Sequence, residues 1–127
     1  MNLLLDTHVL IWFLEGRAEL SGAARSSIEN PISVKWVSVV SLWEIAVKVN
    51  LGKLTLLRPF EELEQRIADN GFQMLPVEFA HTHEYVSLPL HHRDPFDRLL
   101  IAQAMSNGLT VLTRDSQFRL YPIRVLW

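Results

Sequence analysis

The sequence contains no cysteine, only five glycines among its 127 residues, and no long uninterrupted apolar run. Without cysteine, the chain has neither a disulfide framework nor a thiolate metal site. It also lacks the apolar stretch of roughly 18 residues that spans a membrane and the basic start of a signal peptide. The G-x-x-x-x-G-K loop that binds phosphates and the G-x-S-x-G pattern of a serine nucleophile are both missing. We therefore expect a cytoplasmic protein with no membrane contact.

The composition is typical of a globular domain, with 49% hydrophobic and 20% charged residues. A chain of this length can bury one core without cross-links, so we expect a single domain over residues 1–127. The formal net charge of -2 argues against a protein that grips nucleic acid by bulk positive charge. It does not exclude a nuclease, because an acidic site lowers the total charge while local arginines hold the substrate.

Strand-like and helix-like segments alternate along the sequence. Strands are predicted at residues 2–5, 36–40, 72–77, 109–113 and 123–126. Helices are predicted between them, at residues 7–14, 21–30, 41–50, 59–70, 78–86 and 94–107. This alternation predicts an α/β fold with a parallel sheet covered by helices on both faces. In such sheets ligands bind beyond the carboxyl ends of the strands.

Four carboxylates stand where apolar strands or helices begin or end. Asp6 and Asp115 follow two predicted strands, so both would reach the same edge of the sheet. Asp97 lies at the start of an apolar helix, and Glu44 lies among apolar residues. Because an uncompensated buried charge is very costly, carboxylates that converge must take up protons or bind a cation. Oxygen ligands select Mg²⁺ or Mn²⁺, and such a site would act on a phosphate ester.

The aspartates also have local structural explanations. Asp6, Asp94 and Asp115 are each placed to cap the N-terminus of a helix, a common role of this residue. Asp97 falls in the first turn of its helix, where the helix dipole favours negative charge by about 0.3–1 kcal/mol. One such role is ordinary. Several together on one sheet edge favour a shared site.

Glu44 has the strongest alternative explanation. Ser41 precedes it by three residues, which fits the capping box at the start of a helix. Lys48 follows it by four residues and could form an ion pair with it on the same helix face. Taken alone, these neighbours favour a structural role for Glu44.

The histidines show no spacing typical of a metal site, such as H-E-x-x-H. We expect His81, His83, His91 and His92 to be surface or packing residues. His8 is close in sequence to the first of the four carboxylates, so it could lie near the site.

The sequence resembles the PIN domain family and, within it, the VapC-type toxins of bacterial and archaeal toxin–antitoxin pairs. The most specific match is Asp-Pro-Phe-Asp-Arg at residues 94–98, followed by an apolar helix. Residues 4–8, 41–45 and 112–115 match in the same order. The resemblance implies a three-layer α/β/α sandwich with a central, mostly parallel sheet, formed by one PIN domain over residues 1–127. It also implies an Mg²⁺- or Mn²⁺-dependent endoribonuclease toxin, neutralised by a small cognate antitoxin and commonly homodimeric.

The resemblance also implies roles for particular residues. The family's acidic quartet, which is catalytic and binds the metal, maps onto Asp6, Glu44, Asp97 and Asp115. Matching polar positions that would support the ligands are Thr7, Asp94 and Thr113. We expect Arg98 or Arg114 to orient the RNA backbone. The motifs predict no particular RNA target, cut position or antitoxin.

Two other functions stay open at this point. The first is a binding module that holds Mg²⁺ and a partner without cutting anything. A phospho-acceptor signalling domain belongs to this class, but it needs a late lysine, and no lysine follows Lys53. The second is a DNA-directed nuclease with a related acidic site. Dependence on the RNA 2′-hydroxyl would separate it from a ribonuclease.

Overall fold

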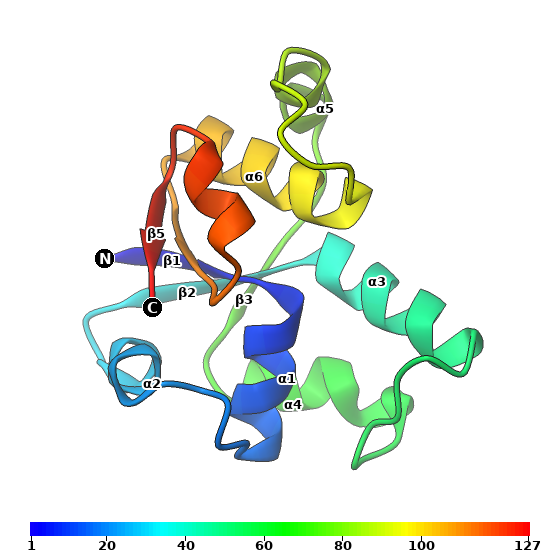
Figure 1. Cartoon of the computed structure of the whole chain (residues 1–127). Coiled ribbons are helices and arrows are strands. Elements are labelled where there is room, and N and C mark those ends of the chain that lie inside the picture. The colour runs from blue at the N-terminus through cyan, green and yellow to red at the C-terminus, as the bar shows by residue number, and fades with distance from the viewer.

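The computed structural model describes residues 1–127 and contains one five-stranded sheet in which all neighbouring strands are parallel. The strand order is β3-β2-β1-β4-β5, so β1 lies at the centre (Figure 1). The strands are β1 (Asn2–Leu5), β2 (Val34–Ser38), β3 (Gln73–Leu75), β4 (Thr110–Leu112) and β5 (Arg124–Leu126). The predicted parallel sheet is confirmed, and it is parallel throughout.

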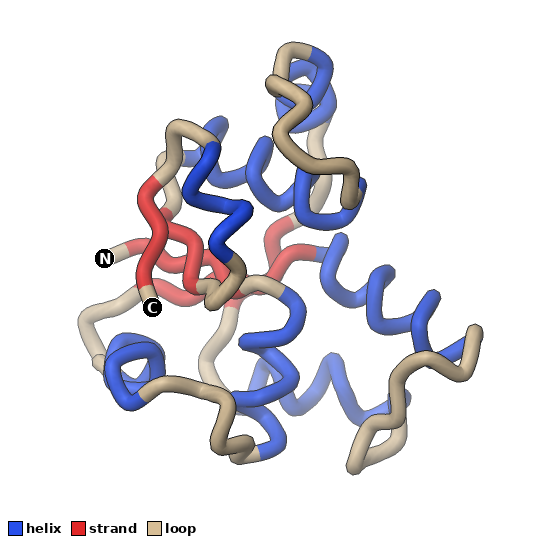
Figure 2. Tube along the Cα trace, viewed as in Figure 1, coloured by secondary structure: helices blue, strands red, loops and turns tan.

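Helices occupy the connections between the strands (Figure 2). The α-helices are α1 (Thr7–Glu15), α2 (Gly22–Glu29), α3 (Val39–Asn50), α4 (Leu63–Asp69), α5 (Phe79–Val86) and α6 (Pro95–Asn107). Two short 3-10 helices, η1 (Phe60–Glu62) and η2 (Ser116–Leu120), complete the regular structure. None of the helices combines the length and the apolar character that crossing a bilayer would require.

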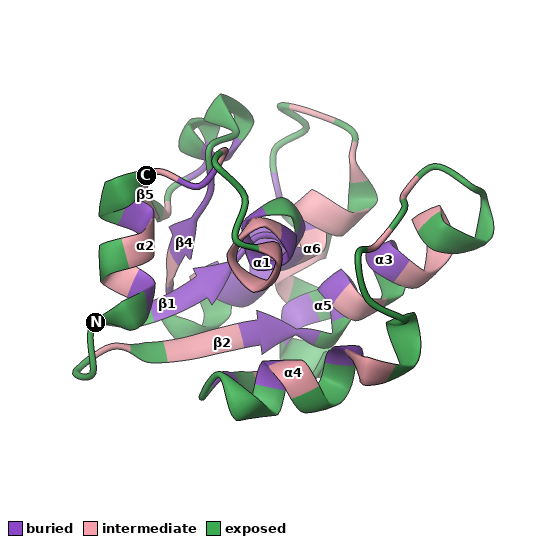
Figure 3. Ribbon diagram, turned by 90° about the horizontal axis from the view of Figure 1, so that it is seen from below, coloured by how far each residue is buried: buried purple, intermediate pink, exposed green.

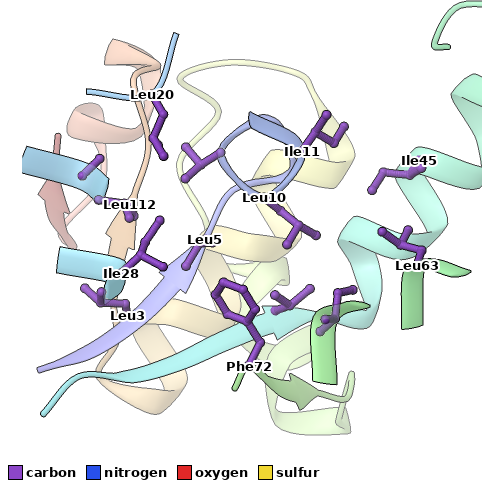
Figure 4. Packing of buried hydrophobic residues seen from close by; sticks show 14 residues of the cluster. Leu3, Leu5, Leu10, Ile11, Leu20, Ile28, Ile45, Leu63, Phe72 and Leu112 are labelled. Carbon is purple, nitrogen blue, oxygen red and sulfur yellow. The ribbon is translucent and has the colours of Figure 1, made fainter. Parts of the chain in front are cut away.

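The side chains of β1 alternate between two hydrophobic cores, one on each face of the sheet. Leu3 and Leu5 pack with residues of α1, α2, α3 and α4 (Figure 4). Leu4 points to the other face and packs with residues of α6 and η2. All three leucines are buried, as the colouring of β1 in Figure 3 shows. Because successive residues of a strand face opposite sides, this central strand joins two helical layers, and the predicted three-layer sandwich is confirmed.

Helix α6 begins and ends at the residues that the sequence predicts. The Asp94 side chain accepts hydrogen bonds from the backbone N–H groups of Phe96, at 2.9 Å, and Asp97, at 3.1 Å. Pro95 is the first helical residue, a position that needs no backbone donor. Gly108 ends the helix in the left-handed conformation, with φ 65°. The capping residues at its two ends therefore determine where this helix begins and ends.

The junction of β2 and α3 differs from the prediction. The strand begins and ends two residues earlier than expected, and Ser38 caps α3 by accepting a hydrogen bond from the Val40 N–H at 3.0 Å. The valines after Ser38 are typical of strands, yet they form the first turn of the helix. Since the cap is Ser38, Ser41 lies inside the helix and does not form a capping box with Glu44. That explanation of Glu44 is wrong.

Candidate active site

Asp6 lies at the carboxyl end of the central strand and is held there from two sides. It caps α1, because its Oδ1 accepts a hydrogen bond from the Val9 N–H at 2.8 Å. Its Oδ2 accepts a short hydrogen bond from the hydroxyl of Thr113, which follows the adjacent strand β4. Burial raises the pKa of Asp6, while the hydrogen bonds from Thr113 and Val9 lower it. The expected cap role is confirmed, and the same carboxylate still faces the strand ends.

Glu44 is buried in the second turn of α3, with 2% of its surface exposed. Thr7 donates a 2.6 Å hydrogen bond to its Oε1 and also lies 3.0 Å from the hydroxyl oxygen of Ser41. Lys48 Nζ lies 2.6 Å from Oε2, so the predicted ion pair is present. Buried carboxylates are tolerated when they are paired and hydrogen-bonded in this way. Both oxygens of Glu44 are therefore fixed in orientation.

Asp97 is in the first turn of α6, with 19% of its side chain exposed. Its carboxylate accepts no hydrogen bond, unlike those of Asp6 and Glu44. Its pKa is raised to about 8, and burial is the largest cause. Neighbouring negative charges contribute the rest of this rise, and in decreasing order they belong to Asp94, Glu44, Asp6 and Asp115. The fold thus brings the charges of the other three quartet residues, and of Asp94, to bear on the Asp97 carboxylate.

Asp115 completes the group from the loop after β4. Its backbone N–H donates to the Thr113 hydroxyl oxygen at 3.0 Å, and its side chain caps η2 through the Gln117 N–H at 2.9 Å. Asp115 is exposed, whereas Asp6 and Thr113 are buried. The Thr113 hydroxyl therefore links the buried carboxylate of Asp6 to the loop that presents Asp115 to solvent.

The arrangement fits a hard divalent cation in chemistry, although it is not a closed cage. No three acidic or histidine side chains are placed together as a complete metal site. Mg²⁺ is usually held by one or two carboxylates and keeps several of its waters. The acidic residues whose charges act on Asp97 offer carboxylate oxygens, which suit Mg²⁺ or Mn²⁺ and not softer metals. The excess negative charge around Asp97 would be relieved by such a cation.

The two arginines expected to bind the substrate lie in different environments. Arg98 is buried, and its Nη1 donates to the carbonyl oxygens of Pro89 and His92, at 2.9 and 3.3 Å, and to the Tyr121 hydroxyl at 2.9 Å. These bonds hold the loop before α6, so a substrate contact does not fit the placement of Arg98. Arg114 is exposed, and its guanidinium stacks 4.5 Å from the centre of the Trp12 ring.

An open cleft of about 290 Å³ runs beside Asp6. Its lining residues are Asp6, His8, Trp12, Arg114 and Asp115. His8 therefore lies near the site, as the sequence predicts. Acidic side chains, an aromatic ring and an exposed arginine side by side suit a nucleic-acid strand, because rings stack on bases and arginine binds phosphate.

Sequence reasoning missed one polar group beside Asp97. His92 Nε2 lies 3.6 Å from Asp97 Oδ2, and the other ring nitrogen lies 2.8 Å from the hydroxyl oxygen of Tyr121. Burial lowers the pKa of His92. The two residues that hold this ring are far apart in the sequence, and no local pattern signals the contact. His81 is the packing residue expected, buried and bonded to Asn107 at 2.8 Å.

The chain belongs to the PIN domain family, whose family model, described as "PIN domain", matches residues 3–123. Among curated proteins it is similar to Ribonuclease VapC22 of Mycobacterium tuberculosis. The two are 29% identical over 119 residues, which cover 93% of this chain and 90% of the relative.

Several solved structures have the same fold, among them a toxin–antitoxin complex from Klebsiella pneumoniae. A chain of VapBC2 from Rickettsia felis, bound to a DNA fragment from their promoter, superposes with a TM-score of 0.72 at 14% identity and covers 100% of this chain and 99% of its own. A chain of DNA-bound VapBC from Salmonella typhimurium gives a TM-score of 0.71 at 18% identity, covering 99% and 97%. A chain of FitAcB from Neisseria gonorrhoeae superposes with a TM-score of 0.68 at 23% identity, and the match covers 98% of this chain and 96% of the FitAcB chain. These likenesses confirm the PIN fold.

Proposed function

We propose that this chain is a metal-dependent endoribonuclease that hydrolyses RNA phosphodiester bonds in the cytoplasm as the toxin of a toxin–antitoxin pair. The observation that carries the proposal is the placement of Asp97, whose pKa is raised to about 8 by burial and by the charges of four neighbouring carboxylates. Similarity to a ribonuclease over most of both chains supports RNA as the substrate.

The proposed ligands of one or two Mg²⁺ or Mn²⁺ ions are Asp6, Glu44, Asp97 and Asp115. When bound, such an ion would activate a water and offset the charge that develops on the scissile phosphate. Asp97 is the member in which neither carboxylate oxygen accepts a hydrogen bond, so it is the proposed principal ligand. Asp6 and Glu44 are held by Thr113 and Thr7 and would supply fixed negative charge around the cation.

Substrate binding is assigned to the cleft beside Asp6. Arg114 would contact an RNA phosphate there, because it is the exposed arginine of the cleft and carries five donors in a planar fork. Trp12 holds the Arg114 guanidinium and itself packs edge-on against Trp127, with ring centres 6.0 Å apart. The aromatic pair would keep the arginine over the cleft and restrict its loss of side-chain entropy on binding.

The proposed partners are a small cognate antitoxin and a second copy of the chain. The solved structures with this fold include VapBC and FitAB complexes, which supports an antitoxin partner. Apolar surface for protein contacts is present near the site, where Trp43 is 62% exposed and packs against Phe96. Light scattering of the purified chain would measure the proposed dimer.

The test is cleavage of a mixed panel of RNAs by the purified protein with Mg²⁺, Mn²⁺ or EDTA, beside Asp97→Asn. A matched control is Asp69→Asn, because Asp69 is exposed on α4 and bonds only to Gln65. We expect cutting by wild type and the control with either metal, and none by Asp97→Asn or in EDTA.

The other outcomes separate the alternatives. Cleavage of matched 2′-deoxy strands as fast as RNA would indicate a DNA-directed nuclease. Binding of Mn²⁺ by wild type but not by Asp97→Asn, with no cleavage of any strand, would indicate a binding module. Cleavage by Asp97→Asn equal to wild type would show that the site is assigned to the wrong residues.

A further inference from the structure

The imidazole of His92 lies between Tyr121 and Asp97. Its side chain is 10% exposed, and its Nδ1 lies 2.8 Å from the Tyr121 hydroxyl oxygen. Its Nε2 is buried and has no hydrogen-bond partner, and it lies 3.6 Å from Asp97 Oδ2. A buried ring nitrogen without a partner calls for an explanation, because such groups are costly.

A chain of hydrogen bonds determines which nitrogen of His92 carries the proton. Arg98 Nη1 donates to the Tyr121 hydroxyl oxygen at 2.9 Å, and a guanidinium can only donate. The backbone N–H of His92 approaches the same oxygen at 3.4 Å. The phenolic proton of Tyr121 is therefore left to be donated, and the acceptor in reach is His92 Nδ1. In the neutral ring, Nε2 then carries the hydrogen, and it faces Asp97.

The gap between His92 Nε2 and Asp97 Oδ2 is longer than a hydrogen bond. A movement of about 0.5 Å brings the two atoms within bonding distance. Asp97 has room for it, since its carboxylate accepts no other hydrogen bond and is partly exposed.

We propose that His92 is a positioning residue, which donates from Nε2 to Asp97 Oδ2 and turns the carboxylate so that Oδ1 is presented to a divalent cation. This role rests on the proposed function of Asp97 as a metal ligand. Arg98 and Tyr121 act through His92 by fixing its tautomer. Residues that hydrogen-bond to a metal ligand generally orient it and tune the affinity of the site for the metal, and His92 would act on Asp97 in this way.

The first measurement requires no cation. Long-range ¹H–¹⁵N spectra of the imidazole rings, assigned with His92→Gln, report the protonated nitrogen of each of the five histidines. We expect Nε2–H at His92 in wild type. In Tyr121→Phe the phenol that receives the Arg98 bond is gone, so the preference for that tautomer should weaken. An Nδ1–H ring with a bare Nε2 in wild type overturns the proposal.

The second measurement compares Mn²⁺ affinity by electron paramagnetic resonance in wild type, His92→Phe and His92→Gln. The phenyl ring keeps the bulk but not the donor, whereas the glutamine amide keeps an N–H near the position of Nε2. We expect His92→Phe to lose about tenfold in affinity and His92→Gln to recover most of it. The control is His91→Gln, since His91 is exposed and packs edge-on against Tyr121 with no side-chain hydrogen bond.

The outcomes distinguish this role from the function on which it rests. Equal affinity of wild type and His92→Phe overturns the positioning role and leaves the ribonuclease proposal intact. A wild type with Nε2–H that binds no Mn²⁺ refutes the metal site itself, and the role of His92 with it. If His92→Phe does not fold, the positioning role is decided by the tautomer seen in the wild-type spectra and by whether His92→Gln keeps most of the Mn²⁺ affinity of wild type.

Discussion

Replacing Asp97 by asparagine should stabilise the protein in the absence of metal, and more so as the pH rises. Burial and the surrounding negative charges raise the pKa of Asp97 from 3.8 to about 8. Between these two values the folded state keeps the proton that the unfolded state has already released. Stability therefore falls as the pH rises through this window, and the loss is complete above the folded pKa. Asparagine has a similar shape but cannot ionise, so the variant lacks this loss.

The magnitude follows from the number of protons involved. One proton held only by the folded state lowers the free energy of unfolding by about 1.4 kcal/mol per pH unit. Between pH 5 and pH 7 the contribution of Asp97 is therefore about 3 kcal/mol, an order-of-magnitude figure for a side chain that is 19% exposed. Groups that titrate alike in both proteins cancel in the difference between them.

The assay is urea unfolding in EDTA at pH 5, 6 and 7, followed by the fluorescence of the four tryptophans. The stability of Asp97→Asn relative to wild type should grow with pH by about 3 kcal/mol. Asp69→Asn should give a constant difference. Added Mg²⁺ at 100 times its Kd should restore about 2.7 kcal/mol to wild type and less to Asp97→Asn. A difference that does not change with pH would refute the raised pKa of Asp97.

Other parts of the structure give further predictions, each measured by chemical unfolding at pH 7. Lys48→Met should destabilise the protein by about 1–3 kcal/mol, because buried Glu44 loses its 2.6 Å partner. The control Lys53→Met, at an exposed position, should change the stability by no more than about 0.5 kcal/mol. Equal effects of the two substitutions would contradict the ion pair. Ile28→Ala should cost about 2–5 kcal/mol, since this side chain of α2 is fully buried, and a loss below 1 would show that α2 packs loosely. Gly108→Ala should cost about 1 kcal/mol through its φ of 65°, and a neutral result would mean that the helix end shifts.

Much of the fold could be predicted from short stretches of sequence. The sequence predicts the central strand at its observed limits. Its three consecutive leucines are buried on both faces of the sheet, and such a continuous apolar run is typical of a central parallel strand. α6 was predicted equally well, since Asp94, Pro95 and Gly108 are strong local signals at its two ends. The start of α3 was misplaced, because β-branched residues favour a strand and only the packing of the helix overrides them.

The candidate site was predictable only in part. Topology places Asp6 and Asp115 at one edge because both follow neighbouring strands, and this could be inferred from alternation alone. The contact of His92 with Asp97 could not, because it depends on Tyr121, 29 residues further along, reaching back to the ring. The interior position of Arg98 was equally hidden, since an arginine beside an acidic motif is usually expected at the surface.

The hydrogen bond between Thr113 and Asp6 also bears on when the site forms during folding. It joins residues 107 positions apart, and the Thr113 N–H is in turn fixed by the Leu126 carbonyl oxygen at 3.2 Å. Contacts of such long range form late, because the loop they close must first lose its conformational freedom. An N-terminal fragment that ends before β4 therefore lacks the group that orients Asp6. A growing chain would carry all of α1 and α3 but no assembled site, and activity would begin only with closure of the sheet.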